Sequence, residues 1–358
     1  MQKTTRFNHF DLLRIIAATL VVYAHSYPLL GLSNPPDIIH SLFGSIDSGR
    51  LGVLIFFTIS GYLNAKSVSR TKTTLFLINR SLRIFPGLFV ALLISAFVIG
   101  PVCTSLPLPQ YFASSQTWVY IYHNILLSVD FNLPGVFENN LYKGTINGSL
   151  WTLPTEFVLY LILPIAIKSF DNKLRTSIFL AAIFLILHLI FTYTTGLPIN
   201  TYGLGSLESV TANSFAFFAG AVIAYSGIEK TSKLQLTFLI ALIFATSQTL
   251  YAPIALLIIL PMLIIKIGSL NTRYFTFKND ISYGLYIYAF PVQQATWHFL
   301  HATTSPLIMS ICSMSTTIIF AALSWHLVEK PILANRNHIS SKLISDALYD
   351  SPDIRTRT

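Results

Sequence analysis

Ten apolar segments, each close to the length of a membrane-crossing helix, dominate this chain of 358 residues. A helix needs about 20 apolar residues to cross a bilayer, and these segments are longer than the alternating strands of a membrane β-barrel. Only 10% of the residues are charged, against about 25% in soluble proteins. The sequence therefore predicts an all-α fold, a polytopic integral membrane helical bundle. The ten segments lie near residues 11–30, 51–66, 84–102, 150–168, 177–195, 212–227, 234–250, 252–267, 281–300 and 307–328.

The positions of Lys and Arg orient these segments, because basic residues collect in cytoplasmic loops. With the N-terminus inside, 20 of the 23 basic residues fall in cytoplasmic segments, while Arg50 and Lys143 lie outside and Arg14 lies within the first segment. We therefore expect about ten transmembrane helices with both termini in the cytoplasm. The formal net charge of +9 is then explained by topology, and binding to nucleic acid is not expected.

The chain is expected to form one transmembrane domain over residues 1–332, followed by a flexible cytoplasmic tail at 333–358. Cys103 and Cys312 match no zinc or redox spacing, so we expect no metal and no redox cofactor. The longest outer segment, about residues 103–149, is rich in aromatic residues. It is interpreted either as an interfacial anchor or as a lid or re-entrant wall over a site.

The first apolar segment contains three ionisable residues, Asp11, Arg14 and His25, which also argues against a cleavable signal peptide. On a helix, Arg14 and His25 lie on nearly one face and roughly 16 Å apart along the axis. Asp11 precedes Arg14 by about one turn and is its expected partner. Charged groups at membrane depth are costly and are usually functional. An imidazole can exchange protons near neutral pH, so His25 is the candidate general base.

Two further groups of residues can join this line of polar side chains. Glu156 lies at the same expected depth as His25, although it can instead serve as a structural partner of Tyr160, one turn further along. Arg80 and Arg83 stand at i and i+3 at the cytoplasmic start of the third segment. With Arg14 they suit a phosphate or pyrophosphate arriving from the cytoplasm, whereas the alternative for the pair is positive-inside anchoring.

Each of the remaining polar candidates has a structural alternative. Ser60 lies between Gly52 and the neighbouring Gly61 in a segment whose glycines permit close helix contact, so packing is preferred over a nucleophilic role. Ser282 and Tyr283 can line a cavity or pack. Glu329 is interpreted as a capping or snorkelling residue at the inner membrane surface.

Five motifs in order resemble the membrane-bound acyltransferase-3 family, the bacterial O-acetyltransferases of surface polysaccharides. They are FDLLRIIAATLVVYAH, GVLIFFTISGYL, the pair Arg80 and Arg83, LWTLPTEFVLYLILP, and ISYGLYIYAFPV. The resemblance covers about residues 7 to 332. The chain departs from the family pattern at Thr152, Pro154 and Ala289, and it lacks the hydrolase-like extracytoplasmic domain that is fused to some relatives.

The resemblance implies an acyltransferase of the bacterial inner membrane. It would move an acetyl group from cytoplasmic acetyl-CoA to a hydroxyl of a cell-surface or lipid-linked glycan. Arg14, Arg80 and Arg83 would hold the phosphates of CoA. His25 would act as general base or accept the acetyl group transiently, and Glu156 would orient or stabilise it. Two alternatives stay open: a transporter or flippase for a lipid-linked glycan, and an acyltransferase that acts on a non-polysaccharide acceptor.

Overall fold

A computed structural model describes residues 9–32, 37–44, 46–193, 200–201, 205–229, 232–247, 249–270, 279–301, 305–336 and 338–340. The basic residues Lys3 and Arg6, and residues 341–358 of the predicted tail, lie outside this part of the chain.

The described chain is mostly helical, which confirms the predicted all-α class. Two strands of two residues each, β1 (Asn200–Thr201) and β2 (Gly205–Ser206), form a single antiparallel pair. The helices are α1 (His9–Leu29), α2 (Ile38–Phe43), α3 (Ser48–Val68), α4 (Thr73–Ile94), η1 (Ser95–Ile99), α5 (Gly100–Cys103), α6 (Leu108–Ala113), α7 (Ser115–Ile125), η2 (Gly148–Trp151), α8 (Thr152–Ser169), α9 (Lys173–Tyr193), α10 (Leu207–Ser226), α11 (Lys233–Thr246), α12 (Ala252–Gly268), α13 (Ser282–Leu300), α14 (Pro306–Ser324), η3 (Trp325–Glu329) and α15 (Lys330–Ala334).

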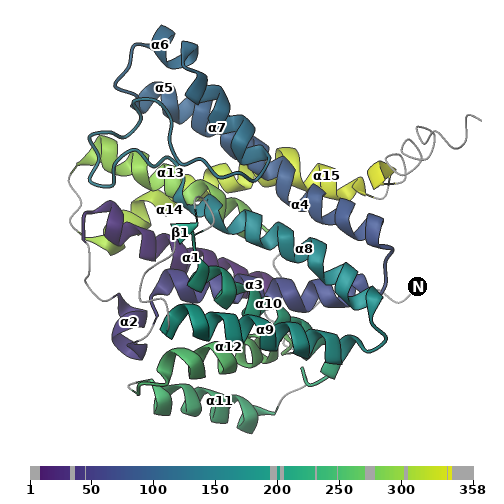
Figure 1. The fold of residues 1–358 in the computed structure, drawn as a ribbon. Helices are drawn as coiled ribbons and strands as arrows, with labels where there is room; N and C mark the ends of the chain where they lie inside the picture. The colour runs from purple at the N-terminus through teal and green to yellow at the C-terminus, as the bar shows by residue number, and fades with distance from the viewer. Residues whose placement is uncertain are drawn as a thin grey trace, which may run out of the picture.

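Each predicted apolar segment overlaps a long helix, and many of these helices run side by side (Figure 1). In the part of the chain that the structure describes, 7 helical stretches are long and apolar enough to cross a membrane, which makes the protein a multi-pass helical membrane protein. α11 and α12 are apolar but shorter. α13 is not among the seven stretches, and it contains two fully buried glutamines, Gln293 and Gln294. The count of ten crossings and the cytoplasmic termini stay predictions.

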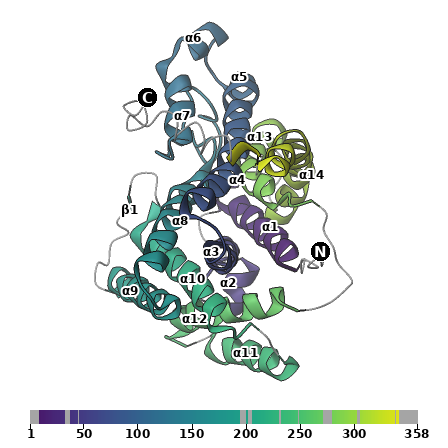
Figure 2. The same ribbon diagram turned by 90° about the vertical axis from the view of Figure 1, so that its right-hand side faces the viewer.

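Helix α3 lies at the centre of the bundle, between α1, α8 and α10 (Figure 2). It approaches α10 very closely: a Cβ atom at Gly61 would lie 1.8 Å from the carbonyl oxygen of Phe217, and one at Gly220 would lie 2.3 Å from that of Thr58. Gly52 is equally tight against the Ala17 carbonyl of α1, at 2.5 Å. The close helix packing predicted for Gly52 and Gly61 is therefore confirmed.

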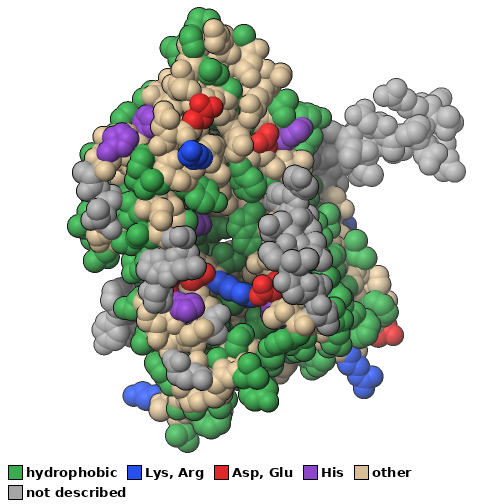
Figure 3. Space-filling view, turned by 60° about the vertical axis from the view of Figure 1, so that its left-hand side comes forward, with side chains coloured by type: hydrophobic (Ala, Val, Ile, Leu, Met, Phe, Trp, Pro, Cys, Tyr) green, Lys and Arg blue, Asp and Glu red, His purple; other side chains and the backbone are tan. Residues whose placement is uncertain are grey.

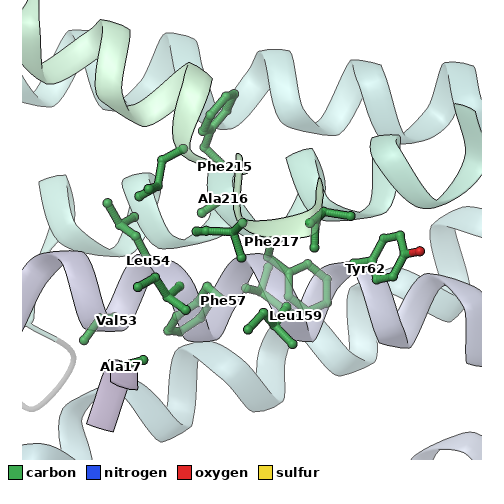
Figure 4. Close-up of a cluster of buried hydrophobic side chains, with 14 of the residues drawn as sticks. Ala17, Val53, Leu54, Phe57, Tyr62, Leu159, Phe215, Ala216 and Phe217 are labelled. Atoms are coloured by element: carbon green, nitrogen blue, oxygen red, sulfur yellow. The ribbon is translucent and has the colours of Figure 1, made fainter. Parts of the chain in front are cut away.

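Apolar side chains fill the space on either side of these glycine contacts. Figure 4 shows Leu54 and Phe57 of α3 near Ala216 and Phe217 of α10, and Val53 of α3 towards Ala17 of α1. This packing fixes the depth of α3, and with it the position of every polar side chain that α3 carries.

The outer segment, residues 104–147, is bound to the bundle through backbone carbonyls that irregular helices leave free. The π-helical turn η1 disturbs the usual hydrogen bonding, and the Tyr111 hydroxyl donates to the carbonyl of Ala96 at 2.8 Å. Pro291 cannot donate to Ile287, and the Asn147 side chain supplies that bond at 2.8 Å. The segment thus forms a fixed wall, with α6 and α7 projecting from the bundle at the top of Figure 1.

Candidate active site

Polar side chains from five long helices line an inner cavity of about 90 Å³. It contains eight of the ten residues predicted as site residues: Arg14 of α1, Ser60 of α3, Arg80 and Arg83 of α4, Glu156 and Tyr160 of α8, and Ser282 and Tyr283 of α13. Segments that are far apart in the sequence are thereby brought to one place. The remaining two predicted residues are Asp11, which lies beside Arg14, and His25, which lines a separate cavity.

Two of the three arginines in this cavity are paired with carboxylates. Arg83 Nη2 donates to Asp280 Oδ2 at 2.6 Å, and Arg83 Nη1 lies 3.7 Å from Glu329 Oε2. Arg14 Nη1 lies 3.4 Å from the same Asp280 oxygen and 3.6 Å from Asp11 Oδ1, which is the partner the sequence predicted. The two guanidiniums are therefore fixed in position and largely neutralised.

Arg80 differs from its neighbours. Within the described residues it forms no ion pair, and its Nε atom is buried without a hydrogen-bond partner. Its guanidinium lies 5.8 Å from the ring centre of Phe76. A buried, unpaired donor is uncommon in folded proteins. Of the three arginines, Arg80 is thus the one whose charge is available to an anionic ligand.

Asp280 is a functional candidate that the sequence reasoning missed. Burial raises the pKa of Asp280, but the guanidiniums of Arg83 and Arg14 and the hydroxyl of Ser282 outweigh burial and lower that pKa to about 2. The Ser282 hydroxyl donates to Asp280 Oδ1 at 2.6 Å. The only signal in the sequence was a lone carboxylate two residues before Ser282. Glu329, interpreted above as a surface residue, is 2% exposed and pairs with Arg83.

Glu156 lies in a hydrogen-bonded cluster inside the inner cavity. The hydroxyl of Tyr160 donates to Glu156 Oε1, and so does that of Ser60, at 3.2 Å. Asn64 Nδ2 in turn donates to the Ser60 hydroxyl at 3.0 Å. The contact with Tyr160 is the structural alternative named from the sequence, and the cluster holds the carboxylate with its face to the cavity.

A second, outer cavity of about 760 Å³ contains His25. The His25 ring meets the edge of Phe290 at 5.0 Å between ring centres. Its Nδ1 atom is buried and has no hydrogen-bond partner among the described residues, which leaves Nε2 for the cavity. Figure 3 shows one face of the molecule that is hollowed, with a basic side chain between two acidic ones at the edge of the hollow.

The two cavities adjoin, because Val53 and Tyr286 line both of them. The Tyr286 hydroxyl is 2.8 Å from that of Thr152, which faces the inner cavity. α1 runs unbroken past this wall, so that it carries Arg14 on the inner side and His25 on the outer side. No hydrogen bond joins His25 to Glu156 within the described residues, and the roles predicted for both stay predictions.

The geometry can be compared with known sequences. A family model described as an acyltransferase domain matches residues 7–326, nearly the whole described bundle. The chain belongs to the acyltransferase-3 family. It is therefore an acyltransferase, and both the predicted enzyme class and the resemblance are confirmed. No solved structure matches the chain significantly.

Three curated relatives bear on this acyltransferase-3 chain. An O-acetyl transferase of Shigella phage Sf6 is 31% identical over 91% of this chain and 96% of its own length. Nodulation protein 10 of Rhizobium leguminosarum is 27% identical over 95% and 97%. A peptidoglycan O-acetyltransferase of Listeria monocytogenes is 23% identical over 94% of this chain but 58% of its own length. Within the described residues, no group of three or more His, Cys, Asp and Glu side chains could hold a metal ion.

Proposed function

We propose that this acyltransferase moves an acetyl group from acetyl-CoA to a hydroxyl of a glycan on the outer side of the bacterial inner membrane. The observation that carries the proposal is the pair of adjoining cavities, with arginines in one and His25 in the other, on either side of Val53 and Tyr286. The relatives named O-acetyl transferase and peptidoglycan O-acetyltransferase support transfer of acetyl to a glycan.

The guanidiniums of the inner cavity suit the phosphates of the donor. CoA carries several phosphate charges, and guanidiniums bind phosphate oxygens with two hydrogen bonds in a fixed geometry. Arg80 supplies the unpaired charge, because Arg14 and Arg83 already face carboxylates. The basic residues predicted for the cytoplasmic side also favour arrival of the donor there.

The outer cavity suits the acceptor, and His25 supplies the base. His25 Nε2 takes the proton from the acceptor hydroxyl while the hydroxyl oxygen attacks the thioester carbon. The new carbon–oxygen bond forms and the carbon–sulfur bond breaks. The thiolate of CoA that leaves then receives the proton from the imidazolium. The negative charge of Glu156, on the far side of Tyr286, stabilises the imidazolium that forms during this step.

The proposal is tested by mass spectrometry of surface glycans from cells with and without the gene. We expect an acetyl increment on a glycan only in cells that contain the gene. A lipid-linked glycan that accumulates on the inner side of the membrane without any loss of acetyl would instead indicate a flippase. An acetyl increment confined to a non-glycan molecule would indicate the other acceptor class.

A further inference from the structure

One buried side chain in the outer cavity, Asn213, has an amide group with no hydrogen-bond partner among the described residues. Asn213 of α10 is 3% exposed and lines the cavity with His25. Its Nδ2 atom is buried without a hydrogen-bond partner among the described residues. An unpaired buried amide is costly, and nearly all such groups in folded proteins are paired. The amide of Asn213 therefore lowers the stability of the bundle unless a bound molecule pairs with it.

Other buried asparagines of this chain show what a structural asparagine does here. Asn140 Nδ2 donates to the side chain of Gln294 at 2.8 Å, and Asn147 Nδ2 donates to the carbonyl of Ile287 at 2.8 Å. Both side chains bind the outer segment to α13. Asn213 makes no comparable bond in the described part of the molecule, so packing alone does not explain an amide at this position.

The surroundings of Asn213 are those of a site for a small polar molecule. Ser209 lies one turn before it on the same face of α10 and also lines the cavity. Trp151 contributes an indole that is held firmly, because a Cβ atom at Gly205 would lie 2.5 Å from its ring. An aromatic surface beside a few fixed hydrogen-bonding groups is the usual composition of a small-molecule site.

The charges of the cavity select against an anionic occupant. Two carboxylates, Asp37 and Asp47, line it, and its guanidinium, Arg50, is paired with Glu208. Among the described residues that line the cavity, there is consequently no unpaired Lys or Arg to bind the carboxylate of an acidic sugar. An acidic sugar would face net repulsion, whereas an uncharged sugar would not.

We propose that Asn213 binds the acceptor: its carboxamide hydrogen-bonds one hydroxyl of an uncharged pyranose, while a neighbouring hydroxyl of the same ring faces His25. This inference rests on the proposed function, since it identifies the part of the outer cavity that recognises the glycan. The carboxamide can serve a sugar hydroxyl both as donor and as acceptor, and turning the amide by 180° exchanges the two atoms.

The test replaces Asn213 with leucine, which has a similar shape and no polar atoms. Thermal unfolding, acetyl-CoA binding and acetyl transfer to the surface glycan are measured on the full-length protein. We expect transfer to fall about tenfold or more, which corresponds to one lost hydrogen bond. We expect the Kd for acetyl-CoA to be unchanged and Tm to be unchanged or raised, because an unpaired buried amide is removed.

Asn140→Leu is the matched control, because the same change there removes bonds that the fold uses, so its Tm should fall. A wild-type rate of transfer in Asn213→Leu would overturn the inference. So would a fall in Tm as large as that of the control, which would make Asn213 structural. If the wild-type protein itself transfers no acetyl to any glycan, the proposed function fails first, and the inference fails with it.

The sugar class is tested separately with neutral methyl hexopyranosides and methyl glucuronide as probes. We expect the neutral glycosides to raise the Tm of the wild-type protein more than that of Asn213→Leu, and methyl glucuronide to have the smaller effect on the wild type. No shift with any neutral glycoside, or a larger shift with methyl glucuronide, would overturn the assignment of an uncharged acceptor.

Discussion

Arg83 of α4 donates to Asp280, the residue that stands two positions before α13, at 2.6 Å. Arg14 of α1 shares the same carboxylate oxygen at 3.4 Å. One carboxylate thus ties three elements together at the inner cavity. It also keeps two guanidiniums at a fixed separation, which prepares the cavity for an anionic ligand without bringing unpaired like charges together.

The pH dependence of stability follows from this contact. The pKa of Asp280 is lowered to about 2 in the folded protein from its ordinary value of 3.8. Its stabilising effect is therefore fully present above pH 3.8 and is lost as pH falls through about 2. That shift corresponds to roughly 2 kcal/mol. Asp280→Asn should lower Tm by a constant amount between pH 5 and 8, and this difference should shrink below about pH 4.

Thermal unfolding of the detergent-solubilised protein across this pH range checks the prediction. Asp171→Asn serves as a control, because this carboxylate lies in the exposed turn between α8 and α9. A difference in Tm between wild type and Asp280→Asn that stays the same down to pH 2 would contradict the account of Asp280.

The sequence was sufficient for the helices and for most of the inner cavity. The length of the apolar segments located the bundle, and eight of the ten predicted site residues, Arg14 and Glu156 among them, proved to line one cavity. Asp280 was missed because a carboxylate in a connecting segment has no periodicity to mark it. Only the packing of α4 against α13 shows that it meets Arg83.

The sequence also could not predict that the candidate site residues are divided between two cavities. His25 and Glu156 were expected to share a depth, and helix spacing cannot show that Val53 and Tyr286 stand between their cavities. Asn213 was not singled out at all. The sequence around Asn213 does not distinguish it from a structural asparagine. Its lack of a hydrogen-bond partner can be recognised only when its neighbours in space are known.

Arg80 should contribute more to donor binding than to the stability of the protein. Removing one charged hydrogen-bond donor to a phosphate costs about 1.5–3 kcal/mol. Arg80→Ala should therefore weaken acetyl-CoA binding by roughly 10- to 100-fold while Tm changes little, because Arg80 forms no ion pair within the described structure. Arg83→Ala should lower Tm as well, since it removes the cationic partner of Glu329 and leaves Asp280 with the longer contact to Arg14.

Equilibrium binding of acetyl-CoA to the purified variants makes this comparison. Arg70→Ala is the matched control, because this exposed arginine lies in the turn between α3 and α4, outside the inner cavity. Wild-type affinity in Arg80→Ala would remove Arg80 from the donor site.

The contact between α3 and α10 should tolerate no side chain at Gly61 or Gly220. A methyl group at Gly61 would lie 1.8 Å from the Phe217 carbonyl oxygen, so the two helices would have to separate. We expect Gly61→Ala to cost about 3 kcal/mol, at the upper end of overpacking effects. Gly220→Ala, on the facing helix, should act in the same way. Retention of the wild-type Tm in both variants would show that the helices are not in close contact.

The outer wall should depend on Asn147. Asn147→Ala leaves the carbonyl of Ile287 unpaired, because Pro291 cannot donate to it. The expected loss of stability is about 1–3 kcal/mol. Hydrogen–deuterium exchange should rise in residues 128–147 and remain unchanged in α9. Equal exchange in the variant and the wild type would mean that this bond does not fix the wall.

The central claim is that His25 is the base for transfer. The most direct measurement is mass spectrometry of the surface glycan from cells that produce His25→Ala, with membrane levels of the protein checked by immunoblotting. The control is His123→Ala, a histidine of α7 outside both cavities. We predict that His25→Ala reaches the membrane in normal amount and adds no acetyl, while His123→Ala acetylates normally. Acetylation at the wild-type level in His25→Ala would contradict the account.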